Sequence, residues 1–128
     1  MRDNIQYWVE LSDYDLETAE ALFQSQRFLY VGFMCHQSIE KILKAYFIHR
    51  TNDTAPYSHS LSFIAKKGGY YSDFNNTQKN FIDQLEPLNI ETRYPLNKER
   101  LLKSLDQVTC KQLLSKTREL QSWIKKKL

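Results

Sequence analysis

The sequence has few residues that break regular structure, since only three glycines and three prolines occur among its 128 residues. A strand-rich fold needs many turns, and turns draw heavily on glycine and proline. Their scarcity favours long helices. Internal repeats, low-complexity tracts and a linker are also absent, so we expect one domain over residues 1–128, long enough to bury one continuous core.

Signals for export and for membrane insertion are missing as well. The N-terminus lacks a secretory signal, and no apolar run is long enough to span a bilayer. The two cysteines, Cys35 and Cys110, lie far apart, and neither belongs to a Cys-x-x-Cys pair. We therefore expect a cytoplasmic protein with reduced thiols and no membrane association.

Motifs for metals and cofactors are equally absent. The three histidines and two isolated cysteines lack the spacing of a zinc site. Gly68-Gly69 lacks the lysine and the preceding strand of a phosphate-binding loop. The net charge of +3 is too small to indicate a partner, and the basic C-terminal segment suits a solvated helix end better than a nucleic-acid patch. We expect neither a metal nor a cofactor.

What the sequence does contain is apolar residues at three- and four-residue spacing, the pattern of amphipathic helices. We predict an all-α fold, an antiparallel up-and-down bundle of four or five helices. The predicted helices cover about 3–24, 27–50, 58–67, 77–86 and 109–124. The predicted core residues are Trp8, Leu16, Leu22, Phe33, Ile39, Leu43, Phe47, Leu85, Leu113, Leu120 and Ile124.

Local signals set the ends of these helices. Gly68-Gly69 ends the third segment and Pro87 closes the fourth. The pattern from Thr109 to Gln112 predicts a capping box that opens the last helix. Residues 51–56 and 89–95 are rich in turn formers and predict loops.

One predicted helix carries a polar strip, which we define as His36, Gln37, Glu40, Lys41 and Lys44 within HQSIEKILKAYF, residues 36–47. The first, third and fifth of these share one helix face at intervals of four residues, and the other two share the neighbouring face. Such a strip is either a structural network between helices or a binding site, and both interpretations stay open.

The first predicted helix carries a matching anomaly. Asp15 interrupts the mostly apolar row of Trp8, Leu11, Thr18 and Leu22. A carboxylate in such a row needs a cation, and the lysines of the polar strip are the nearest candidates.

We therefore predict one polar network that joins Asp15 to Glu40 and Lys44. In this prediction His36 borders the network, which opens at one end toward Arg93 and Tyr94. A loop arginine and tyrosine are suited to phosphate and base contacts, and this makes them ligand-binding candidates too.

These residues also resemble a known family. Asp15-Leu16, then HQSIEKILKA from His36 to Ala45, then His59-Ser60-Leu61, then Arg93-Tyr94-Pro95 resemble, in order and spacing, the HEPN family of small helical bundles. The resemblance implies a helical bundle, a homodimer, and a nucleotidyltransferase-type partner in a toxin–antitoxin pair. It also implies binding of RNA or a nucleotide, and many members act as metal-independent ribonucleases.

The chain departs from the catalytic pattern of that family, in which an arginine is followed four to six residues later by histidine. Arg27 precedes His36, and Arg50 precedes His59, each with eight residues between them. His36 and His59 are the catalytic candidates that remain, and the simplest interpretation of His59 is a helix-start residue that binds backbone.

The departure leaves two functions open. The first, which the missing spacing favours, is an interaction module whose ligand or partner contacts come from the polar strip with Arg93 and Tyr94. The second is an RNA endonuclease that uses a non-standard arrangement of histidine and arginine.

Overall fold

The computed structural model describes residues 2–91 and 98–128, with side chains described for all of these except 2, 3, 90, 91, 98 and 101. The chain forms α1 (Arg2–Gln24), α2 (Phe28–Thr51), α3 (Leu61–Lys67), the 3-10 turn η1 (Tyr71–Asp73), α4 (Asn76–Leu85), α5 (Leu88–Glu91), α6 (Lys98–Ser104) and α7 (Gln107–Lys125). The described residues contain no strand, and the all-α prediction is confirmed.

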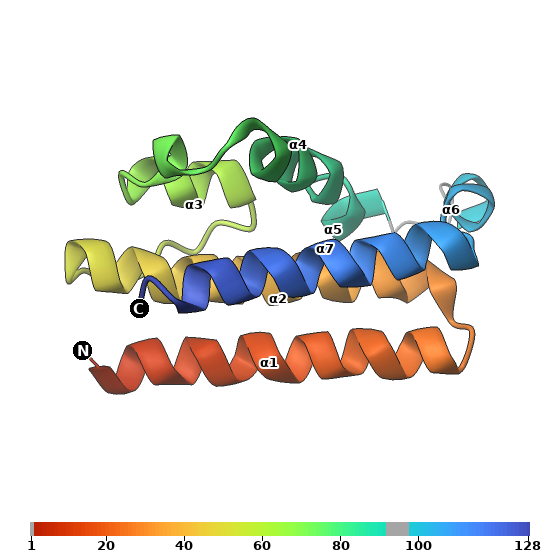
Figure 1. Ribbon diagram of the computed structural model, residues 1–128, viewed down its shortest axis with the longest axis horizontal. Helices are drawn as coiled ribbons and strands as arrows, with labels where there is room; N and C mark the ends of the chain where they lie inside the picture. Colours follow the sequence, from red (N-terminus) through yellow and green to blue (C-terminus); the bar gives the residue numbers. More distant parts are fainter. Residues whose placement is uncertain (1, 92–97) are drawn as a thin grey trace.

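The long helices α1, α2 and α7 lie side by side, and the short elements α3, α4 and α5 cover the other side of α2 (Figure 1). From its first residue, α2 runs back along α1, and the chain then returns through α3, η1, α4 and α5 before α7 runs in the direction of α2 (Figure 1). This is an up-and-down bundle whose third leg is broken into short pieces.

The breaks in the third leg follow local chemistry. The backbone N–H of Gly68 closes α3 on the Ile64 carbonyl, and Gly69 takes φ 77°, a left-handed conformation in which glycine carries no steric cost. Asn75 and Gln78 form a capping box that starts α4, and Pro87 follows the end of that helix. The predicted ends at Gly68-Gly69 and Pro87 are confirmed.

Two predicted helix starts are wrong, and two short helices were missed. The third helix begins at Leu61, with Ser60 as its cap, three residues after the predicted start at 58. The last helix begins at Gln107, because the Asp106 carboxylate accepts the Thr109 N–H at 2.8 Å and caps the helix three residues earlier than the predicted capping box. Residues 88–91 form the short helix α5 where a loop was predicted, and α6 was not predicted at all. Four- and seven-residue helices are too short to show a clear apolar period.

The core fills the space between α1, α2 and α7 and extends beneath α3 to α5. Eight of the eleven predicted core residues are buried, and Trp8, Leu22 and Phe33 are partly buried. A polar contact crosses this core: the Ser12 hydroxyl donates to the Ser38 carbonyl at 2.7 Å, and Gln121 Nε2 donates to the Ser12 hydroxyl at 2.9 Å. Buried hydroxyl and amide groups thereby fix the register of the three long helices.

Over the described residues, none of the helices carries an apolar stretch of the length and hydropathy needed to cross a membrane.

Candidate functional site

The polar strip lies on the most enclosed helix of the bundle. α2 packs against α1 and α7 on one side and against α3, α4 and α5 on the other, so most of its surface faces protein. His36, Gln37, Glu40 and Lys44 are buried, and Lys41 is partly buried. Polar groups taken out of water in this way need partners within the protein. The strip is therefore not the solvated face of an amphipathic helix.

One half of the strip joins α2 to α1 and α5. Lys41 Nζ lies 2.9 Å from the Asp15 carboxylate and 3.2 Å from Gln37 Oε1. Gln37 Nε2 in turn donates to Asn89 Oδ1 at 2.9 Å. We call these four residues the Lys41 chain. Each side-chain group in it meets a group of complementary charge or hydrogen-bonding type, as a structural connection requires.

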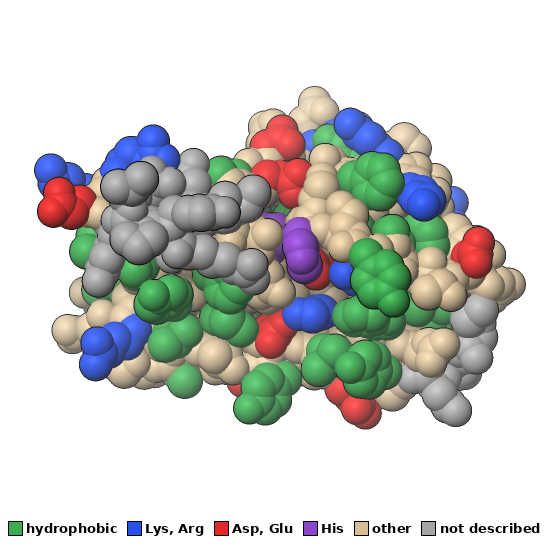
Figure 2. All heavy atoms as spheres, turned by 180° about the vertical axis from the view of Figure 1, so that it is seen from behind, with side chains coloured by type: hydrophobic (Ala, Val, Ile, Leu, Met, Phe, Trp, Pro, Cys, Tyr) green, Lys and Arg blue, Asp and Glu red, His purple; other side chains and the backbone are tan. Residues whose placement is uncertain are grey.

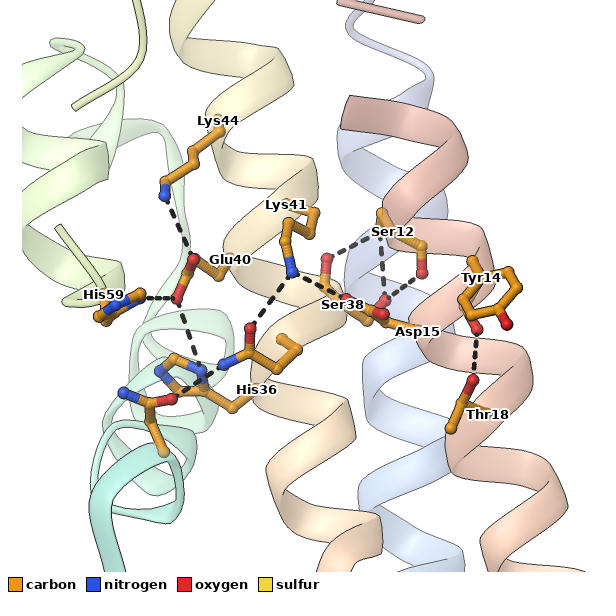
Figure 3. A network of polar contacts seen from close by, with 12 residues as sticks. Ser12, Tyr14, Asp15, Thr18, His36, Ser38, Glu40, Lys41, Lys44 and His59 are labelled. Carbon is orange, nitrogen blue, oxygen red and sulfur yellow. Dashed lines mark hydrogen bonds and ion pairs between the residues drawn. The ribbon is translucent and has the colours of Figure 1, made fainter. Parts of the chain in front are cut away.

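The other half of the strip surrounds one buried carboxylate. Glu40 is 2% exposed, and it accepts hydrogen bonds from Lys44 Nζ at 3.2 Å and from His59 Nδ1 at 3.0 Å. His36 Nδ1 lies 4.0 Å from the same Glu40 oxygen that binds His59. We call Glu40, Lys44, His59 and His36 the Glu40 cluster. Figure 3 shows it on one side of α2, with Lys41 and Asp15 on the other side.

The predicted single network of Asp15, Glu40 and Lys44 is wrong in one link. The Glu40–Lys44 pair is present, but Asp15 pairs with Lys41. The reason is angular: successive residues of an α-helix are turned by about 100°, so Glu40 and Lys41 point toward different neighbours. Lys44 reaches α1 in another way, with its Nζ 5.2 Å from the centre of the Trp8 ring.

Of the other predicted site residues, His59 has a different role from the predicted one, and two lie outside the described residues. His59 does not bind the backbone at the start of α3, because the Ser60 hydroxyl accepts the Phe63 N–H and caps that helix. The His59 side chain turns to Glu40 instead and stays 58% exposed. Arg93 and Tyr94 lie outside the described residues, so the predicted open end of the network has no structural description.

Two site residues were missed by the sequence reasoning. Asn89 was assigned to a loop, and nothing in its neighbourhood indicated a partner for Gln37, which is 52 positions away. Trp8 was assigned to the core, and the spacing of its row gave no sign of a cation beside its ring. Both contacts join residues that are distant in sequence.

The family model described as HEPN domain matches residues 5–128, nearly the whole chain. The chain belongs to the HEPN family. The crystal structure of TT1696 from Thermus thermophilus has the same fold, with a TM-score of 0.83 at 17% identity over 97% of this chain and 98% of that one. No curated protein matches the chain.

The ribonuclease arrangement of other HEPN proteins has no counterpart around the described histidines. The hydrogen bonds and ion pairs that His36 and His59 make with described residues involve no arginine. Arg50, the arginine that precedes His59 in sequence, lies 2.8 Å from the Asp73 carboxylate and 3.4 Å from the Tyr46 hydroxyl. The described residues also hold no group of three histidine, cysteine or acidic side chains able to bind a metal ion.

His36 is the most unusual member of the Glu40 cluster. It is fully buried, and neither ring nitrogen has a hydrogen-bond partner among the described residues. Burial lowers the pKa of His36 from 6.5 to about 4, against the opposing pull of the Glu40 carboxylate, while the charges of His59 and Lys41 lower it further. His36 is therefore a neutral imidazole at neutral pH, and its ring faces the Glu40 carboxylate, 4.0 Å from Nδ1, and the backbone of His59.

The two ion pairs of the strip should differ in their contribution to stability. In Lys44→Met, Glu40 loses its cation at a site where both partners are less than 8% exposed, and we expect a loss of about 3–5 kcal/mol. In the matched control Lys41→Met, the pair with Asp15 is 14–19% exposed, so the loss should be smaller. Urea unfolding at pH 7 measures both. Equal stability of Lys44→Met and the wild type would contradict the structural importance of the Glu40–Lys44 pair.

The buried His36 makes stability depend on pH. Because its pKa is lower in the folded than in the unfolded chain, unfolding takes up a proton between pH 6.5 and about 4. Its contribution should be complete above pH 6.5 and decline toward pH 4, at up to roughly 1.4 kcal/mol per pH unit.

Thermal and urea unfolding between pH 7.5 and 4 test this effect by comparing the wild type with His36→Phe. The variant should show a shallower decline, whereas the control His49→Phe, at an exposed position of the same helix, should keep the wild-type slope. Identical slopes for all three proteins would show that His36 titrates normally in the folded chain.

Proposed function

We propose that this chain is a non-catalytic HEPN module that binds RNA or a nucleotide and acts with a nucleotidyltransferase-type partner in a toxin–antitoxin pair. The partner class and the ligand class are those that the resemblance to the HEPN family implies, and the family match over residues 5–128 supports this choice. The non-catalytic part of the proposal rests on how the residues of the polar strip are paired. Its lysines pair with carboxylates of the same chain, and the described partners of His36 and His59 include no arginine.

The pairing of these residues matters because RNA cleavage has definite chemical requirements. Metal-independent cleavage needs a group that takes the proton of the 2′-hydroxyl and a fixed cation that stabilises the developing charge on the phosphate. Lys41 and Lys44 are unsuited to the second task, because moving either one to a phosphate would leave Asp15 or Glu40 without its counter-charge. Binding without cleavage is therefore the function that the described residues support best.

A second candidate, an RNA endonuclease with a non-standard arrangement, has one observation in its favour. The buried Glu40 carboxylate holds Nδ1 of the exposed His59, as a carboxylate does in hydrolases that use histidine as a base. The pair supplies a proton acceptor, but its described partners include no arginine to stabilise the phosphate, and for this reason this candidate ranks second.

Cleavage assays separate the two candidates. Purified protein incubated with end-labelled RNA in the presence of a chelator should leave the RNA intact on a gel, since the described site lacks a charge-stabilising arginine. Cleavage that is lost in both His36→Ala and His59→Ala, and retained in the control His49→Ala, would reverse the ranking.

We also propose that the chain acts as a homodimer. Large side chains are exposed on its long helices, among them Tyr7 and Tyr14 of α1 and Tyr30 of α2. Hydrophobic side chains gather on the α1 side of the face in Figure 2. Exposed apolar surface of this kind is often covered in an assembly.

Light scattering at micromolar concentration should give twice the 15.3 kDa mass of the chain. Tyr14→Glu places a charge on the exposed α1 face and should shift the mass toward the monomer, whereas the control Tyr57→Glu, at a 98% exposed loop position, should not. A monomeric wild type would contradict the proposal.

A further inference from the structure

We infer that His59 is the ligand-contacting residue of the Glu40 cluster and that its Nε2 accepts a hydrogen bond from the 2′-hydroxyl of a ribose. The inference rests on the proposed binding of RNA or a nucleotide and assigns the ligand group that this site takes. It would make the protein prefer ribose over deoxyribose.

The tautomer of His59 follows from its partner. The Glu40 carboxylate is the acceptor in the hydrogen bond with Nδ1, because it also accepts one from Lys44. Nδ1 of His59 is therefore the donor, and the neutral ring presents Nε2 as an acceptor. The ring is 58% exposed, so a ligand can reach it, while the carboxylate that fixes it is 2% exposed and out of reach. Figure 3 shows the ring beside Glu40, on the far side of that carboxylate from α2.

The charges of the strip decide which ligand group fits. Two carboxylates, Asp15 and Glu40, face two ammonium groups, Lys41 and Lys44, and the four charges cancel. His36 adds no charge at neutral pH. Among these described groups, a phosphate placed at His59 would find no net positive charge, and a cation would find no net negative charge. An uncharged donor, such as a hydroxyl, pairs with Nε2 without any such requirement.

Two further features indicate a ligand site and not only a structural cluster. The buried ring of His36 lies next to Glu40 without a hydrogen bond of good geometry to any described residue, and such groups are rare in purely structural networks. Tyr57, two residues before His59, is 98% exposed. An exposed aromatic ring two residues from a hydroxyl acceptor offers a surface on which the base of a nucleoside can stack while its sugar donates a hydrogen bond.

The ribose can belong to a free nucleotide or to an RNA strand, and paired probes distinguish these sources. Binding is measured by calorimetry for adenosine monophosphate and its 2′-deoxy form, and by fluorescence anisotropy for a labelled RNA 12-mer and the DNA of the same sequence. The wild type should bind the ribose form about three- to tenfold more tightly than the deoxyribose form in at least one pair, the ratio expected for one hydrogen bond between neutral groups.

Two variants and one control test the assignment to His59. His59→Phe keeps a ring but removes Nε2, and it should reduce the ribose preference to about one. Glu40→Gln offers an amide N–H to Nδ1, which moves the ring proton to Nε2 and converts the acceptor into a donor. This variant should also lose the preference, and ¹⁵N NMR should show the changed tautomer. The control His49→Phe should keep the wild-type ratio.

The possible results distinguish a failure of the His59 assignment from a failure of the proposed function. Equal affinity of the wild type for ribose and deoxyribose forms would overturn the inference while leaving nucleotide or RNA binding intact. A preference that survives in both His59→Phe and Glu40→Gln would also overturn it. Absence of binding to all four probes would reject the proposed function, and the inference with it.

Discussion

The enclosure of α2 is the constraint on which the rest of this structure depends. A helix with other helices on both sides cannot leave charged groups in water, yet α2 carries a glutamate, two lysines and a histidine at its centre. Each of the three charges must then find a counter-charge at hydrogen-bonding distance. Asp15 of α1 supplies one counter-charge, Glu40 and Lys44 supply each other's, and the connection before α3 supplies His59.

These contacts also position the short elements of the bundle. The Lys41 chain ends at Asn89, so it holds α5 against α2. The Glu40–His59 contact holds the connection before α3, and Glu86, just after α4, accepts hydrogen bonds from Ser60 and from the Leu61 N–H at the start of α3. The broken third leg therefore depends on polar contacts as well as on the apolar core. A change in the strip would affect both the stability of the bundle and the position of His59.

The two halves of the strip differ in whether they leave polar groups that a ligand can meet. In the Lys41 chain every polar side chain has a partner among the described residues, as in a structural network. In the Glu40 cluster His36 makes no hydrogen bond of good geometry with a described residue, and the His59 side chain stays 58% exposed. The sequence suggested one strip with one purpose, whereas the fold separates a structural half from a half that can meet a ligand.

The sequence by itself determined the helical class, the helix ends at Gly68-Gly69 and Pro87, most of the core, the Glu40–Lys44 pair and the family resemblance. These depend on residues close together in the chain, where the helix period and local breakers fix the geometry. The tertiary structure alone decided the partner of Asp15, the partner of Gln37 and the orientation of His59. Those contacts join residues 19 to 52 positions apart. The rotation of α2 against its neighbours selects them, and that rotation is set by packing over the whole core.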